Sequence, residues 1–267
     1  MNMENVEISG MFWRRFPGAA RPLVILHGLF GSGDNWQSLG GELASEREVL
    51  IPDLPNHGRS VHVGALTFPE LTRIMWESLE ELEYGHEGAP VVLLGHSMGG
   101  KVAMAMAFDR PEAVSRLIVA DIAPKPYPPR HNDIFEAMER VAREKPTSRS
   151  AAEEIMAGYI PQKGVRLFLL KSLVRSSEDD TFRWQLDLAG LREGYSDILG
   201  WPYSDERYNG PAAVISGGNS PYVTTDDSAV IHKFLPRAAL EVIPNAGHWL
   251  HSEERDRFLE LVRSHID

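Results

Sequence analysis

The chain has 267 residues, 43% of them hydrophobic, which is enough to bury the core of one large domain with an insertion. Its 38 acidic and 27 basic residues give a formal net charge of −11, and no cluster of Lys or Arg is present, which argues against a nucleic acid partner. Cysteine is absent, so disulfides, thiolate zinc sites and cysteine nucleophiles are excluded.

No apolar run reaches the roughly 18 residues that a membrane-spanning helix needs, so no membrane partner is expected. Residues 1–10 carry acidic side chains and lack the basic and apolar regions of a secretory signal. We therefore expect a cytoplasmic protein that exists as a monomer or a homodimer.

The first part of the chain predicts strands followed by a helix. Residues 4–16 form either one strand or a hairpin about Gly10, and residues 22–26 form a buried strand. The glycine-rich loop that follows opens a helix over about residues 34–44, with Asp34 as its cap.

The next strand covers residues 48–51 and leads into a polar loop over residues 52–60. Asp53 and His57 lie in this loop, and we expect them to fix its shape through hydrogen bonds from side chain to backbone. Residues 68–84 show apolar side chains at helical spacing on one face, so they predict an amphipathic helix.

A strand followed at once by a helix surrounds Ser97. Residues 91–94, VVLL, are apolar without alternation, which is typical of a strand buried on both faces of a parallel sheet. The G-x-S-x-G turn at residues 95–99 then enters helical sequence, and its glycines allow the close approach that so sharp a turn needs. Ser97 is thereby placed in strained backbone at a helix N-terminus, where negative charge is stabilised. We predict Ser97 as a nucleophile.

A strand over residues 115–120 leads to Asp121 and completes the alternation that predicts a parallel α/β sheet. The proline-rich residues 124–129 break this rhythm, and residues 132–199 read as amphipathic helices with no strand. We expect residues 124–204 to form a helical cap that walls the substrate pocket, with a purely structural insertion as the alternative.

The sheet resumes after the cap, with strands predicted over residues 211–216 and 239–243 and helices over residues 226–234 and 252–266. Residues 1–123 and 205–267 therefore make up the expected core, and the cap is inserted after its sixth strand.

A serine nucleophile needs a general base that titrates near neutral pH, and histidine has that property. Of the ten histidines, His248 lies in a loop of small residues directly after the last predicted strand, whereas His251 begins a helix. We choose His248. Two loops that follow parallel strands can aim backbone N–H groups at one point, and we assign the oxyanion donors to Leu29 and Met98.

Six motifs together resemble the α/β-hydrolase superfamily: HGLFGS at 27–32, PDLPNHGRS at 52–60, GHSMGG at 95–100, DIAP at 121–124, GGNSPYV at 217–223 and AGHW at 246–249. More narrowly, the sequence is similar to the abhydrolase-type esterases and acyl thioesterases of bacteria and mitochondria. This resemblance implies a mostly parallel sheet flanked by helices, with eight strands, or seven if the first is missing here. It also implies a helical cap and a Ser-His-acid triad with no cofactor and no metal.

The acid departs from the common pattern of the superfamily, which places an aspartate after the seventh strand. Ser220 stands in that position, and a hydroxyl cannot supply the negative charge that orients a histidine. We expect Asp121, after the sixth strand, to be the acid and Ser220 to be an auxiliary partner. The alternative is Asp226 or Asp227, brought in by a shift of the loop.

The predicted function is a serine hydrolase that cleaves carboxylic esters of short to medium acyl chains. Expected substrate contacts are Phe30, His131, Phe135, Met138, Tyr159, Trp184 and Trp249. An acyl-CoA thioesterase is the first alternative, and a perhydrolase, a lactonase or a carbon–carbon hydrolase would use the same triad. A ligand-binding receptor with a vestigial site is the alternative from another class.

Overall fold

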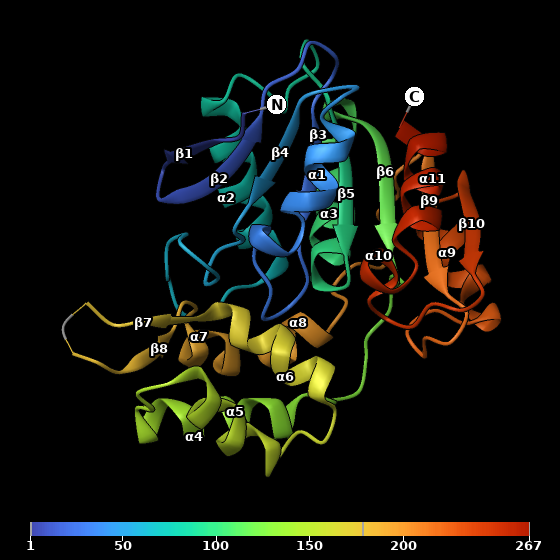
Figure 1. Ribbon diagram of the computed structural model, residues 1–267. Coiled ribbons are helices and arrows are strands. Elements are labelled where there is room, and N and C mark those ends of the chain that lie inside the picture. The colour runs from blue at the N-terminus through green and yellow to red at the C-terminus, as the bar shows by residue number, and fades with distance from the viewer. Residues whose placement is uncertain (1, 178, 267) are drawn as a thin grey trace.

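The computed structural model describes residues 2–177 and 179–266 and has an eight-stranded sheet at its centre (Figure 1). The strands lie in the order β1 (Glu4–Ile8), β2 (Met11–Phe16), β4 (Val49–Pro52), β3 (Leu23–Leu26), β5 (Val91–His96), β6 (Val114–Ala120), β9 (Ala212–Gly217) and β10 (Ala238–Ile243). The pairs β1–β2 and β2–β4 are antiparallel, and all other neighbours are parallel. Residues 4–16 form the hairpin about Gly10, and the alternative of a missing first strand is wrong.

Helices cover both faces of the sheet because the central strands are apolar on both sides. In β3, Leu23 and Ile25 belong to one buried cluster and Val24 and Leu26 to another, as expected from the alternation of side chains along a strand. The first cluster includes α1 (Gln37–Leu43), α10 (Leu250–Glu253) and α11 (Arg255–Ile266), and the second includes α2 (Phe68–Glu81), α3 (Met98–Asp109) and α9 (Ser228–Phe234). Within the described ranges, no helix is long and apolar enough to cross a membrane.

Short 3-10 helices lead into or out of several elements: η1 (Gly33–Asn35), η2 (Pro111–Ala113), η3 (Leu170–Ser172) and η4 (Thr225–Asp227). The helix predicted from Asp34 therefore begins as the 3-10 turn η1, for which Ser32 is the N-cap. Asp34 is not the cap, because it lies inside this turn, and its carboxylate accepts a hydrogen bond from Arg14 Nε at 2.8 Å. The final predicted helix is likewise divided, into α10 and α11.

The segment between β6 and β9, which we call the cap, lies across the carboxyl ends of the parallel strands (Figure 1). Its helices are α4 (Asn132–Glu144), α5 (Arg149–Ala157), α6 (Lys163–Leu169), α7 (Leu188–Glu193) and α8 (Tyr195–Leu199). The expectation of no strand is wrong, because β7 (Leu173–Arg175) and β8 (Phe182–Trp184) form an antiparallel hairpin. Leu173 pairs with Trp184, and both side chains are buried. The spacing of this short apolar run also fits a helix, but packing across the pair of strands favours the strand.

A buried lysine joins the core to the cap. Lys101 lies on α3, and its Nζ donates to the carbonyl oxygens of Leu199 and Gly200 at 2.9 and 2.8 Å, and to that of Ile198 at 3.3 Å. These carbonyls lie at the C-terminal end of α8, where a cation is favoured. Lys101 therefore fixes the end of the cap beside the helix that begins at Ser97.

Candidate active site

Ser97 lies between β5 and α3 in the strained conformation that its motif predicts, with φ 54° and ψ −121°. The flanking glycines are required by close approach of the backbone. A Cβ at Gly95 would lie 2.2 Å from the carbonyl oxygen of Gly99, and one at Gly99 would lie 2.4 Å from that of Leu26. The turn therefore holds the serine above the carboxyl end of the sheet.

Three side chains from distant parts of the chain meet at this turn. His248 Nε2 lies 3.1 Å from Ser97 Oγ, and His248 Nδ1 lies 2.7 Å from Asp121 Oδ2. Asp121 follows β6, is fully buried and has φ 51°, while His248 lies in the loop after β10. The arrangement can take a proton from the serine hydroxyl and stabilise the resulting imidazolium.

Ser220 and a backbone amide complete the surroundings of Asp121. Ser220 Oγ donates to Asp121 Oδ2, and the Gly217 amide donates to Oδ1 at 3.1 Å. Asp227, by contrast, pairs with Lys125 at 2.5 Å and accepts from the Thr224 amide. The structure thus brings Asp121, and not Asp227, to His248.

The imidazole of His248 is held on its face and through its backbone. The Tyr222 ring stacks on it, with centroids 3.9 Å apart and planes 17° apart. On the other side, His96 Nε2 donates to the His248 carbonyl oxygen at 2.7 Å. The pKa of His96 lies well below its ordinary value, mainly because the ring is buried and also because a charge on His248 would repel one on His96. His96 therefore stays neutral.

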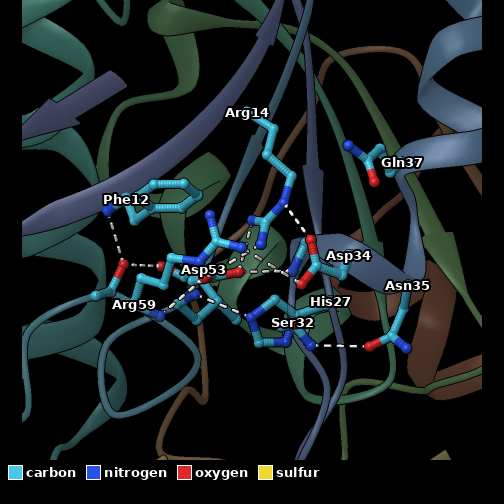
Figure 2. A network of polar contacts seen from close by, with 12 residues as sticks. Phe12, Arg14, His27, Ser32, Asp34, Asn35, Gln37, Asp53 and Arg59 are labelled. Carbon is cyan, nitrogen blue, oxygen red and sulfur yellow. Dashed lines mark hydrogen bonds and ion pairs between the residues drawn. The ribbon is translucent and has the colours of Figure 1, made fainter. Parts of the chain in front are cut away.

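A buried carboxylate, that of Asp53, contacts the end of the loop that carries Leu29, and Figure 2 shows the network of polar contacts around it. Asp53 accepts from the Gly33 and Arg59 amides at 2.7 and 2.9 Å, and Arg14 Nη1 pairs with it at 2.7 Å. Because Asp53 is fully buried, these donors are needed to offset its loss of hydration.

Two histidines tie the same loop to its neighbour in a reciprocal way. The Leu54 amide donates to His27 Nε2 at 2.9 Å, and the Phe30 amide donates to His57 Nε2 at 3.2 Å. Burial lowers the pKa of His27 to about 4 and that of His57 to about 3, so both rings accept these bonds as neutral imidazoles. The predicted structural role of Asp53 and His57 is confirmed.

Two cavities open from Ser97. The larger, of about 570 Å³ out to its mouth, has Phe30, His131 and Trp249 in its wall, as expected from the sequence. The smaller, of about 330 Å³, is lined by Leu29, Met98 and Tyr222, among others. Leu29 and Met98, the predicted oxyanion donors, thus line one cavity together with Ser97, the predicted nucleophile.

Comparison with known proteins agrees with the fold described above. A sequence model described as the alpha/beta hydrolase fold matches residues 21–255. The chain belongs to the α/β-hydrolase family. It is 35% identical over 254 residues to the sn-1-specific diacylglycerol lipase ABHD11 of Xenopus laevis, covering 92% of this chain and 80% of the relative. It is 33% identical over 247 residues to the esterase YbfF of Escherichia coli strain K12, covering 92% and 93% of the two chains. A solved structure of a marine microorganism esterase has a TM-score of 0.90 at 33% identity, covering 96% of this chain and 98% of that one.

Four of the expected substrate contacts of this α/β-hydrolase lie elsewhere. Phe135, Met138 and Trp184 are buried in the hydrophobic cluster of the cap, and Tyr159 packs against that cluster. None of the four is in the wall of the larger cavity. Helical spacing identifies an apolar face, but a face that packs within the cap cannot be told from one that meets the substrate.

Sequence reasoning also missed part of the cavity wall. Trp36 and His251 line the larger cavity and stack on each other, with ring centroids 4.1 Å apart. Ile134 and Val165 contribute from the cap. His251 lies only three residues after His248, so its place beside the catalytic loop was available as a signal from the sequence.

Proposed function

We propose that this protein is a serine hydrolase that cleaves carboxylic esters of short to medium acyl chains through an acyl-enzyme. The observation that carries the proposal is the continuous chain of contacts from Ser97 Oγ to His248 and from His248 to Asp121, at 3.1 and 2.7 Å. The relatives named as esterases and as a diacylglycerol lipase support ester hydrolysis as the reaction.

In the first half-reaction, Ser97 attacks the acyl carbonyl while His248 takes the serine proton and delivers it to the leaving alkoxide. Asp121 keeps the His248 proton on Nδ1 in the ground state and stabilises the imidazolium that forms. The amides of Leu29 and Met98 stabilise the oxyanion, and water, activated by His248, then releases the acid.

The cap supplies apolar surface for the acyl chain. Ile134, Val165, Phe168 and Leu169 come from α4 and α6 and face the larger cavity, where they replace water around a hydrocarbon chain. The net charge of −11 gives no long-range attraction to an acyl-CoA thioester. Of the two basic residues that could contact CoA phosphates, Lys125 and Arg130, Lys125 is already paired with Asp227, which leaves Arg130 alone for that role. A simple ester therefore suits the site better than a CoA thioester.

The chain divides into a core and an inserted cap. We propose a core of residues 1–123 and 205–267 and a cap of residues 124–204, since the buried apolar side chains of the cap form one hydrophobic cluster, to which the core contributes Phe30. We also propose a cytoplasmic location and a monomer or homodimer, to be examined by cell fractionation and by light scattering.

Hydrolysis of p-nitrophenyl esters from acetate to palmitate, with an acyl-CoA series beside it, tests the proposed function. We expect the highest kcat/KM among the short and medium esters and a clear fall at palmitate. A higher kcat/KM for acyl-CoA would replace the ester by a thioester. Binding of these esters without any turnover would instead support a receptor.

A further inference from the structure

Among the residues that the structure describes, the two cavities at Ser97 share three wall residues: Leu29, Ser97 and His131. An ester that is attacked by Ser97 must have its acyl and alcohol parts on opposite sides of the reacting carbon. The point where the cavities meet is therefore where the ester group itself lies. His131, which comes from the cap, lines both cavities and so lies at the point where they meet.

The hydrogen bonds of Tyr195 determine which nitrogen of His131 carries the proton. Tyr195 Oη accepts from the backbone amides of Arg130 and His131, both at 3.1 Å, and lies 2.7 Å from His131 Nδ1. A phenol has two acceptor positions and one proton, so its proton must go to His131 Nδ1. The neutral ring then carries its own proton on Nε2.

That Nε2–H is available to a ligand. Among the described residues, His131 makes a side-chain hydrogen bond through Nδ1 alone, and Nε2 is not among the buried side-chain atoms without a partner. Burial, reinforced by His248 and Arg130, lowers the pKa of His131 to about 4, so the ring is a neutral donor at physiological pH. A neutral donor beside His248 does not oppose the formation of the imidazolium, as a fixed cation would.

We propose that His131 is a third hydrogen-bond donor to the oxyanion, acting from the cap through Nε2–H together with the Leu29 and Met98 amides. This inference rests on the proposed function, because it assigns a role within the same reaction. It makes the cap part of the catalytic site. A donor whose hydrogen bond strengthens as negative charge develops on the substrate oxygen raises kcat, whereas a residue that only forms the cavity wall changes mainly KM.

The test replaces His131 by Phe and by Gln and measures p-nitrophenyl butyrate hydrolysis and inhibition by a trifluoromethyl ketone, which forms a tetrahedral adduct with a serine. We expect His131→Phe to lower kcat by about 100-fold and to raise the inhibition constant by a similar factor, with KM changed by less than about threefold. His131→Gln keeps an N–H donor and should recover at least about tenfold of the lost kcat. The exposed His232, on α9, gives the matched control His232→Phe, for which no change is expected.

Tyr195→Phe provides a second measurement if His131→Phe fails to fold. It leaves the imidazole in place but removes the proton that fixes its tautomer, so kcat should fall by about tenfold with the inhibitor weakened in parallel. Unchanged kcat and inhibition in the folded His131→Phe enzyme, or a change in KM alone, would overturn the inference. The proposed function would then still stand, provided that the native enzyme hydrolyses the ester and Ser97→Ala does not.

Discussion

The base and the roof of the cavity are held together by different forces. The base consists of the loops after β3, β4, β5, β6, β9 and β10, where buried polar groups such as Asp53, Asp121 and His57 form directed hydrogen bonds. The roof consists of cap helices whose interior is apolar, with Phe135 and Met138 fully buried in it. The base therefore fixes atoms to within a hydrogen-bond length, while the roof, apart from His131 and the Tyr195 hydroxyl bound to it, fixes a shape.

This difference predicts how each region fails. Loss of a polar group in the base should reduce the rate of reaction with little change in substrate range, because its partners are aligned for one geometry. Loss of an apolar group in the roof should reduce the stability of the cap, or alter the substrate range, with less change in the rate for a small ester. Matched substitutions in the two regions test this difference.

In the base, Asp121→Asn should lower kcat by about 10⁴-fold, because the amide cannot stabilise the His248 imidazolium. Ser220→Ala should lower kcat by only about tenfold, since it removes one hydrogen bond to Asp121 and leaves the Gly217 amide in place. Steady-state hydrolysis of p-nitrophenyl butyrate measures both. A large loss in Ser220→Ala with little loss in Asp121→Asn would show that the acid is misassigned.

In the roof, Phe135→Ala should lower the free energy of unfolding by about 4 kcal/mol, because it leaves a cavity between the rings of Phe30 and Tyr195. The centroids of these two rings lie 5.0 and 5.1 Å from the centroid of the Phe135 ring. Urea unfolding measures this change, and kcat for p-nitrophenyl acetate should stay within about threefold of the native value. Phe168→Ala is the matched control, since Phe168 is half-buried and lines the cavity. Its stability should change less, and its preference among acyl chains should change more. The reverse pattern would mean that the roles of the two phenylalanines are exchanged.

The sequence predicted the base well because its information is local. The sequence around Ser97 specifies a strand that ends in the G-x-S-x-G turn, and the small residues around His248 specify another turn at the end of a strand. Parallel strands bring those ends to one edge of the sheet. Even the proximity of Asp121 to His248 could be predicted, because Ser220 stands where a carboxylate was expected and Asp121 follows the adjacent strand.

The roof was predicted only in outline. Helical spacing gave the amphipathic helices but missed the β7–β8 hairpin, where pairing between Leu173 and Trp184 outweighs a pattern that also fits a helix. It also assigned Phe135, Met138 and Trp184 to the substrate, although their side chains pack within the cap. Which apolar face meets the cavity depends on how the helices dock on the core, through contacts such as Lys101 with the end of α8, and no short stretch of sequence contains that information.

The central claim is that Ser97 is the nucleophile. Intact-mass and peptide mass spectrometry after reaction with a fluorophosphonate would test it most directly. We predict one adduct per chain, located on Ser97, with loss of esterase activity in proportion to labelling, and no adduct on Ser97→Ala. Labelling of Ser97→Ala at an unchanged rate, or an adduct on another residue that accounts for the loss of activity, would contradict the mechanism.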